Sequence, residues 1–257
     1  MLNAQQLGNA LLESTLNDGL AFDHPQFGSG TSATVPTQIN GPSVPAVVAP
    51  GGTDWLDAIF RSAPTQNIDF TVSNGSEKSK FAFSGGLLNR QGTQLETGFV
   101  RGLLRLNSEH KVANRFTAGQ HLNVSFSNSR GGNVVQTALR VNPLIPVTDS
   151  EGNFGGSFAA SAGLANATNP VADLLRASDD FFRQTRIVGD VFLGVDIIDG
   201  LKFKTSLGGD LNSFNDRRFL ARNPEHSEPR PTNSLTCLLY TSPSPRDATL
   251  SRMPSSA

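Results

Sequence analysis

The sequence predicts an all-β fold, an antiparallel meander of about six strands that forms part of a large transmembrane β-barrel. Hydrophobic and polar residues alternate with a period of two in six segments. Short and long connections between these segments alternate along the chain. Charged residues make up 17% of the 257 residues, against about 25% in a typical soluble domain. Such a chain has the composition of a protein that faces an apolar solvent as well as water.

Composition also excludes several classes. With a formal net charge of −1, the chain is not a nucleic-acid binder by bulk electrostatics. One cysteine excludes an intramolecular disulfide framework and a multi-cysteine metal site. No signal peptide is visible after Met1. No apolar stretch approaches the roughly 18 to 20 residues of a membrane helix.

The N-terminal part predicts helical and irregular structure. Residues 3–17 carry apolar side chains at helical spacing, with Gly19 just beyond the end. Residues 23–53 are rich in Pro, Gly, Ser and Thr, which indicates a linker or a draped loop. A short amphipathic turn follows at 54–60, where Asp54 can cap and Trp55, Ile59 and Phe60 are expected to be buried.

Six strands are expected after Pro64. The first two, around 68–73 and 80–87, form a hairpin about a tight turn at 74–78. The third and fourth cover 101–107 and 122–127, and the fifth and sixth cover 186–196 and 201–212. Residues 128–180 have no strand period but contain a helix with Asn169 as N-cap and Pro170 in its first turn.

The order of the connections separates two architectures. Those after the first, third and fifth strands are short, and those after the second, fourth and sixth are longer. Outer-membrane barrels have short periplasmic turns and long extracellular loops. The alternative is a soluble antiparallel sandwich, a secreted carbohydrate-binding module, in which one apolar row is buried against a second sheet. That row is Phe81, Phe83, Leu104, Leu106, Leu122, Val124, Phe126, Val191 and Leu193.

Several sequence segments resemble one family in the order in which that family has them. Gly52–Asn67, Val72–Lys80, Ser84–Gly86 and Arg101–Asn107 resemble the start of the barrel in the SusC/RagA family of TonB-dependent outer-membrane receptors. The likeness is strongest over 52–127, looser to about 212, and weak before residue 50. The signal peptide, TonB box, plug and C-terminal strand of the family are not found in this sequence.

The resemblance implies a division of the chain. Residues 1–64 would be a plug-to-barrel linker segment, 65–236 a partial barrel, and 237–257 a tail. Barrels of this transporter class have about 22 strands, so the chain would be a truncated, inactive fragment.

The resemblance also implies a function. The whole protein would take up glycans, peptides or similar nutrients across the outer membrane of a Gram-negative, Bacteroidota-like cell. Its partners would be the TonB complex, a SusD-like lipoprotein and outer-membrane lipid. We expect no enzymatic activity and no cofactor, and the substrate stays open.

Candidate site residues come from the alternation together with the resemblance. Charged residues on the polar face of the strands would face the plug or the lumen, and the alternative is that they are ordinary solvated strand residues. These candidates are Arg101, Arg105, Asp190, Lys202, Lys204 and Asp210. Residues 128–180 would contact substrate or the SusD-like partner, with no single residue singled out. No catalytic or metal constellation is recognised, since a His110/His121 pair is better explained as two exposed strand-end residues.

The tail from Cys237 onward has no period of two or 3.6, and it places Pro243, Pro245 and Pro254 in a Ser-rich run. It is similar to the translated sequencing-adapter ends found on truncated reading frames, so we expect it to be non-native or disordered. A natural disordered terminus is the alternative.

Overall fold

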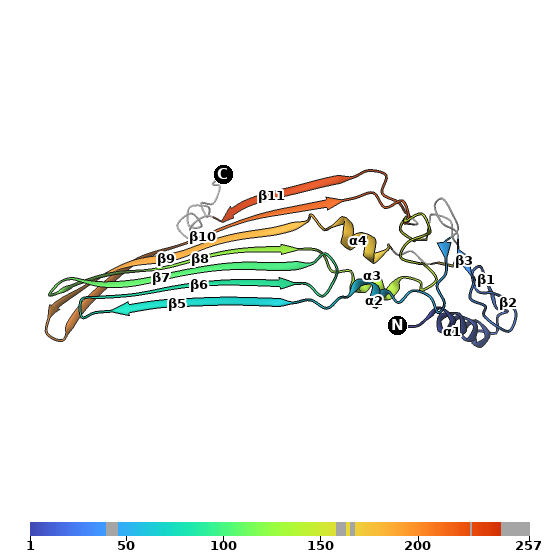
Figure 1. Ribbon diagram of the computed structural model, residues 1–257, viewed down its shortest axis with the longest axis horizontal. Coiled ribbons are helices and arrows are strands. Elements are labelled where there is room, and N and C mark those ends of the chain that lie inside the picture. The colour runs from blue at the N-terminus through green and yellow to red at the C-terminus, as the bar shows by residue number, and fades with distance from the viewer. Residues whose placement is uncertain (40–45, 158–162, 165–167, 227, 243–257) are drawn as a thin grey trace, which may run out of the picture.

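A long antiparallel sheet dominates the computed structural model, which describes residues 1–39, 46–157, 163–164, 168–226 and 228–242 (Figure 1). Seven strands lie in the order β11-β10-β9-β8-β7-β6-β5, so each pairs with its neighbour in sequence. The predicted antiparallel meander is therefore confirmed. The strands are β5 (Thr65–Gly75), β6 (Ser79–Gln91), β7 (Gly98–Ala113), β8 (Phe116–Arg130), β9 (Phe181–Ile198), β10 (Leu201–Leu220) and β11 (Ser234–Ser242).

The strand β11 is an addition to the six strands expected. It begins before Cys237 and includes residues 237–242 of the tail, for which no regular structure was expected. Leu235, Leu238 and Leu239 give it apolar residues on both faces, which hides the period of two. Its backbone pairs with β10 from Leu220↔Ser234 to Asn212↔Ser242, so the edge of β10 supplies the order. Residues 243–257 lie outside the described residues.

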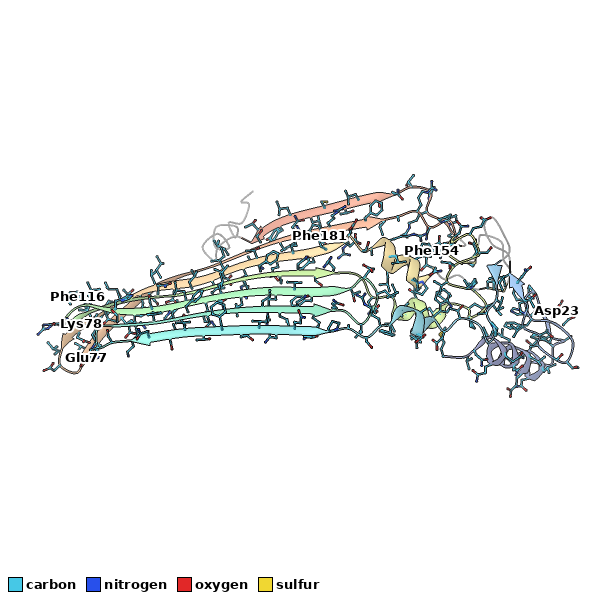
Figure 2. All side chains as sticks on the ribbon, in the orientation of Figure 1. Asp23, Glu77, Lys78, Phe116, Phe154 and Phe181 are labelled. Atoms are coloured by element: carbon cyan, nitrogen blue, oxygen red, sulfur yellow. The ribbon has the colours of Figure 1, made fainter. Side chains whose placement is uncertain are left out.

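The connections differ at the two ends of the sheet. Residues 76–78, 114–115 and 199–200 make the short turns, and residues 92–97, 131–180 and 221–233 make the longer connections. Figure 2 shows Glu77, Lys78 and Phe116 at the short-turn end and Phe154 at the opposite end. The predicted segregation of connections is confirmed, and we call the second end the loop end.

The N-terminal segment lies at the loop end with the remaining helices and two small hairpins (Figure 1). The hairpins pair β1 (Asp23–His24) with β2 (Gly28–Ser29) and β3 (Gln38–Ile39) with β4 (Ala46–Val47). The helices are α1 (Ala4–Asn17), α2 (Trp55–Ile59), α3 (Val135–Arg140) and α4 (Pro170–Arg176). In the described residues, no helix is long and apolar enough to cross a membrane.

Capping side chains begin three of these helices, two of them at the predicted caps Asp54 and Asn169. Asn3 and Gln6 form a reciprocal capping box at α1. The Asp54 carboxylate accepts the backbone N–H of Leu56 and Asp57 at α2, and the Asn169 side chain does the same for α4. No local pattern indicated α3, which begins without a side-chain cap.

A single hydrophobic core joins the N-terminal segment to the connection between β8 and β9. Trp55 and Ile59 of α2 are fully buried there, together with Leu144 and Ile145. Phe27 and Ile39 of the Pro- and Gly-rich segment join the same core, so the described part of that segment is a loop draped over this core. Phe60 was expected to be buried but is 41% exposed, because the helix ends at Ile59 and Phe60 continues as extended backbone.

Candidate functional site

The strand register places most apolar residues of the central strands on one face, whereas Leu103, Val188 and Phe192 lie on the other. Directly opposed residues share a face, as Phe83 does with Leu106 and Val124 with Ile187. None of the nine residues of the predicted apolar row is buried, which contradicts the sandwich alternative. The exposed residues of this apolar face are Ile68, Phe70, Val72, Phe81, Leu87, Leu104, Leu106, Leu122, Phe126, Ile187, Val191, Leu193, Phe203, Leu207 and Leu211.

The six charged candidates all lie on the opposite face, which we call the polar face. The register connects Arg105 of β7 through Asn123 and Val188 to Asp210 of β10 in one cross-strand row. Arg101 lies on the same face of β7, two residues before Leu103 in the sequence. Asp190, Lys202 and Lys204 follow on β9 and β10. The structure thus brings the candidates onto one face.

Partners within the sheet contact four of these six groups. Arg186 Nε donates to Asp210 Oδ1 at 3.0 Å, and His121 Nδ1 lies 3.1 Å from the Asp190 carboxylate. Lys202 Nζ lies 3.5 Å from Asp196 Oδ1. These partners stand on neighbouring strands, so only the cross-strand register could have identified them.

The fourth group, the Lys204 ammonium, contacts an aromatic ring. Lys204 Nζ lies 3.9 Å from the ring centroid of Phe192, a cation–π geometry. Phe192 is buried although it stands on the polar face, and its ring stacks on His121. Arg101 and Arg105 differ from the other four, because neither has an ion pair or a side-chain hydrogen bond within the described part of the chain.

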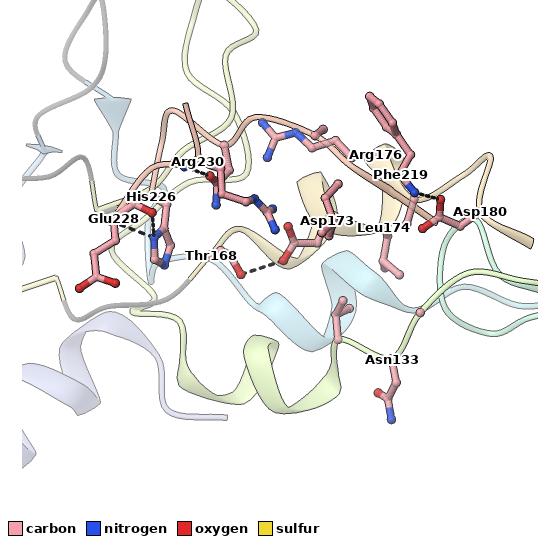
Figure 3. A pocket seen from close by; sticks show the side chains of 16 residues that line it. Asn133, Thr168, Asp173, Leu174, Arg176, Asp180, Phe219, His226, Glu228 and Arg230 are labelled. Carbon is pink, nitrogen blue, oxygen red and sulfur yellow. Dashed lines mark hydrogen bonds between the residues drawn. The ribbon is translucent and has the colours of Figure 1, made fainter. Parts of the chain in front are cut away.

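A cavity of about 510 Å³ opens at the loop end, between α4 and the connection from β10 to β11 (Figure 3). Its walls hold both signs of charge, from Asp173, Arg176, Asp180, Glu228 and Arg230, and also the His226 ring. The sequence did not indicate this cavity, because residues 221–230 carry no periodic pattern. Only the folded chain brings them against α4.

Buried polar contacts fix the shape of the cavity. Arg176 Nη2 donates to Glu225 Oε2 at 3.0 Å, and Glu225 is only 2% exposed. The Thr168 hydroxyl donates to Asp173 Oδ2 at 2.7 Å. Asp180 Oδ1 accepts the backbone N–H of Phe219. Desolvation by burial raises the pKa of Asp173 above its usual range, against the opposing effect of the Thr168 hydrogen bond.

The structure does not bring the His110/His121 pair together. His110 and His121 lie on opposite faces of the sheet, and His110 contacts Ser79 at 3.0 Å instead. No group of three metal-ligating side chains is present among the described residues.

Known proteins similar to this chain are TonB-dependent receptors. No family model matches the chain. TonB-dependent receptor P3 of Formosa agariphila is 26% identical over 63% of this chain and 17% of its own length. Receptor P39 of the same organism is 27% identical over 63% of this chain and 16% of its own length. The chain spans about a sixth of these relatives.

Solved structures share the fold. The RagAB peptide importer in its closed-closed state matches 74% of this chain and 22% of its own, with a TM-score of 0.57 and 23% identity. A second structure, of the RagAB peptide transporter, gives a TM-score of 0.58 at 21% identity. The resemblance that the sequence suggested, to SusC/RagA-like TonB-dependent receptors, is confirmed by these similarities, and so is the fold class.

Proposed function

We propose that this chain is part of a TonB-dependent, SusC-like transporter of the outer membrane, with its apolar face toward lipid and its polar face toward a lumen. The observation that carries the proposal is the single-layered sheet with one long exposed apolar face. In water such a face is costly, at about 25 cal/mol per Å² of apolar surface. Lipid around the apolar face would remove that cost. The polar face would suit a lumen that is filled by a plug.

The connections support an orientation for this sheet. Short turns on the periplasmic side and long loops outside are the rule in outer-membrane barrels. The loop end would then lie outside the cell. Because residues 1–64 share their core with the connection between β8 and β9, they would form part of the outer cap as they enter the barrel at Thr65.

Transport belongs, in this proposal, to a longer chain. Six or seven strands cannot close a barrel, and open sheet edges leave backbone groups unpaired in lipid. The nutrient would be a peptide, glycan or similar molecule, and the relatives' names support a TonB complex as the source of energy. A SusD-like lipoprotein would cover the loop end, and the six polar-face candidates would meet the plug.

The membrane assignment is tested at two adjacent leucines. Leu103 and Leu104 of β7 are the same residue type on opposite faces. In a Cys237→Ser background, Leu103→Cys and Leu104→Cys would each be labelled with an environment-sensitive fluorophore in mixed micelles of lipid and detergent, which do not require a closed barrel. We expect a quencher attached to lipid chains to quench only the label at 104, and aqueous iodide to quench the label at 103 more strongly.

The comparison between the two sites is internally controlled, since both labels share one strand and one parent side chain. Equal quenching of both labels by iodide, with none by lipid quencher, would show that the apolar face is not in lipid. The proposal would then fail.

A further inference from the structure

We infer that the loop-end cavity is a binding site for a small molecule that carries a carboxylate next to an N–H or O–H donor. The cavity, of about 510 Å³, lies within the range of roughly 300 to 1,000 Å³ for small-molecule sites. This inference deepens the proposed function by adding a ligand site, and the binding test below requires neither transport nor a membrane orientation.

Most charges of the cavity wall are already engaged. Arg176 is held by Glu225 and also lies over the Phe154 ring, 5.1 Å from its centroid. Asp180 accepts from the Phe219 backbone, and His226 Nδ1 is engaged by the Glu228 backbone. These groups shape the wall, and their existing partners leave them with less hydrogen-bonding capacity for a ligand.

Two charges of the described wall are not engaged in this way, the exposed Glu228 carboxylate and Arg230. The Arg230 backbone N–H donates to Asn223 Oδ1 at 2.6 Å, which fixes the start of the Arg230 side chain. Its Nε atom is buried and has no hydrogen-bond partner, and the guanidinium makes no ion pair within the described residues. A buried guanidinium donor without an acceptor costs free energy that a bound acceptor would recover.

Asp173 supplies the second contact. Figure 3 shows the Arg230 guanidinium pointing toward the Asp173 carboxylate, and the charge of Arg230 acts on Asp173 without a direct ion pair. Thr168 occupies one oxygen of Asp173, which leaves acceptor capacity on the other. A ligand carboxylate would accept from the planar fork of Arg230, while an adjacent N–H or O–H of the ligand would donate to Asp173.

Two sources of this chemistry are available to a nutrient receptor. A peptide C-terminus has a carboxylate beside its last amide N–H, and a uronic acid has one beside hydroxyl groups. The test is isothermal titration calorimetry on the full 257-residue chain in detergent micelles. The probes are a trialanine peptide, its C-terminally amidated form, and a uronic acid trisaccharide with its neutral counterpart.

We expect one acidic probe to bind at least about ten-fold more tightly than its neutral form. A difference of this size is typical of one charge-assisted hydrogen bond that the neutral form cannot make. Arg230→Gln should remove that preference, and Arg230→Lys should restore it only in part. Arg222→Gln is the matched control, an exposed arginine of the same connection that is absent from the cavity wall. It should bind like the unmodified chain.

Which acidic probe binds identifies the source. Equal binding of acidic and neutral forms, absence of binding by both acidic probes, or unchanged preference in Arg230→Gln would each overturn the inference. Circular dichroism of each variant verifies that the sheet is retained. Because the lipid-quenching experiment is separate, failure here leaves the proposed membrane role to its own test.

Discussion

The packing of the loop end changes the protonation equilibrium of a single residue, Asp173. Burial raises its pKa, so the folded state favours the protonated acid relative to the unfolded chain. That stabilisation is complete below the unfolded pKa of about 4 and is lost as pH rises through the folded value. The direction is the reverse of the usual one for an aspartate in a salt bridge.

Removing the charge of Asp173 should therefore stabilise the folded state of the loop end at neutral pH. Asp173→Asn keeps an oxygen that can accept from Thr168 but carries no buried charge. We expect slower hydrogen exchange in α4 at pH 7 than in the unmodified chain, and a smaller difference at pH 4. Mass-spectrometric hydrogen exchange measures both.

The neighbouring Asp179→Asn is the control, since Asp179 is exposed. It should leave exchange in α4 unchanged. If exchange in α4 became faster in Asp173→Asn at pH 7, the charged form would be the stabilising one and the sign argued here would be wrong.

At the scale of the strand, the packing of the polar face depends on a glycine, Gly119, that lies beneath the ring of Phe192. Gly119 of β8 opposes Phe192 of β9. A Cβ atom at Gly119 would lie 2.3 Å from Phe192 Cζ and 2.5 Å from the Ser108 carbonyl oxygen. Only glycine lets the Phe192 ring lie flat on the strand, where it meets His121 and Lys204.

Gly119→Val should accordingly displace Phe192 and destabilise the sheet by about 1 to 3 kcal/mol, the usual cost of overpacking. Unfolding by urea in detergent micelles, followed by circular dichroism, measures the change. Gly102→Val on β7 is the control, because a Cβ atom there meets nothing within 4 Å. β-Strand propensity favours valine over glycine at both positions, so an equal loss of stability in both variants would mean that the Phe192 contact does not set the cost.

The strands themselves were readable from the sequence, and their partners were not. Alternation of Leu122, Val124 and Phe126 with polar residues is a local property, so it predicts β8 without knowledge of a neighbour. The pairs Arg186 with Asp210 and His121 with Asp190 depend on register between strands. Register is set by long-range pairing, which explains why the polar-face candidates were found without their partners.

At the scale of the whole molecule, none of the described segments covers the apolar face of the sheet. The apolar face and the open edges at β5 and β11 are both surfaces that associate in water. We expect the full chain to form large assemblies in buffer and small, β-rich particles in detergent micelles. Sedimentation velocity in the two solvents measures this difference.

A detergent titration through the critical micelle concentration serves as the control, because assemblies should disperse only above it. A monomer in plain buffer that melts cooperatively would be incompatible with an apolar face made for lipid.

The sequence by itself determined the six strands from β5 to β10, the helices α1, α2 and α4, the apolar and polar faces and the alternation of short and long connections. Each of these follows from local periodicity or from a side chain that accepts backbone N–H groups two and three residues further along, as Asn169 does at α4. Tertiary structure alone decided which residues meet. The core that joins Trp55 to Leu144 and the seventh strand along β10 depend on contacts between distant segments. So does the cavity around Arg230, because a chain's local pattern does not encode which surfaces pack against it.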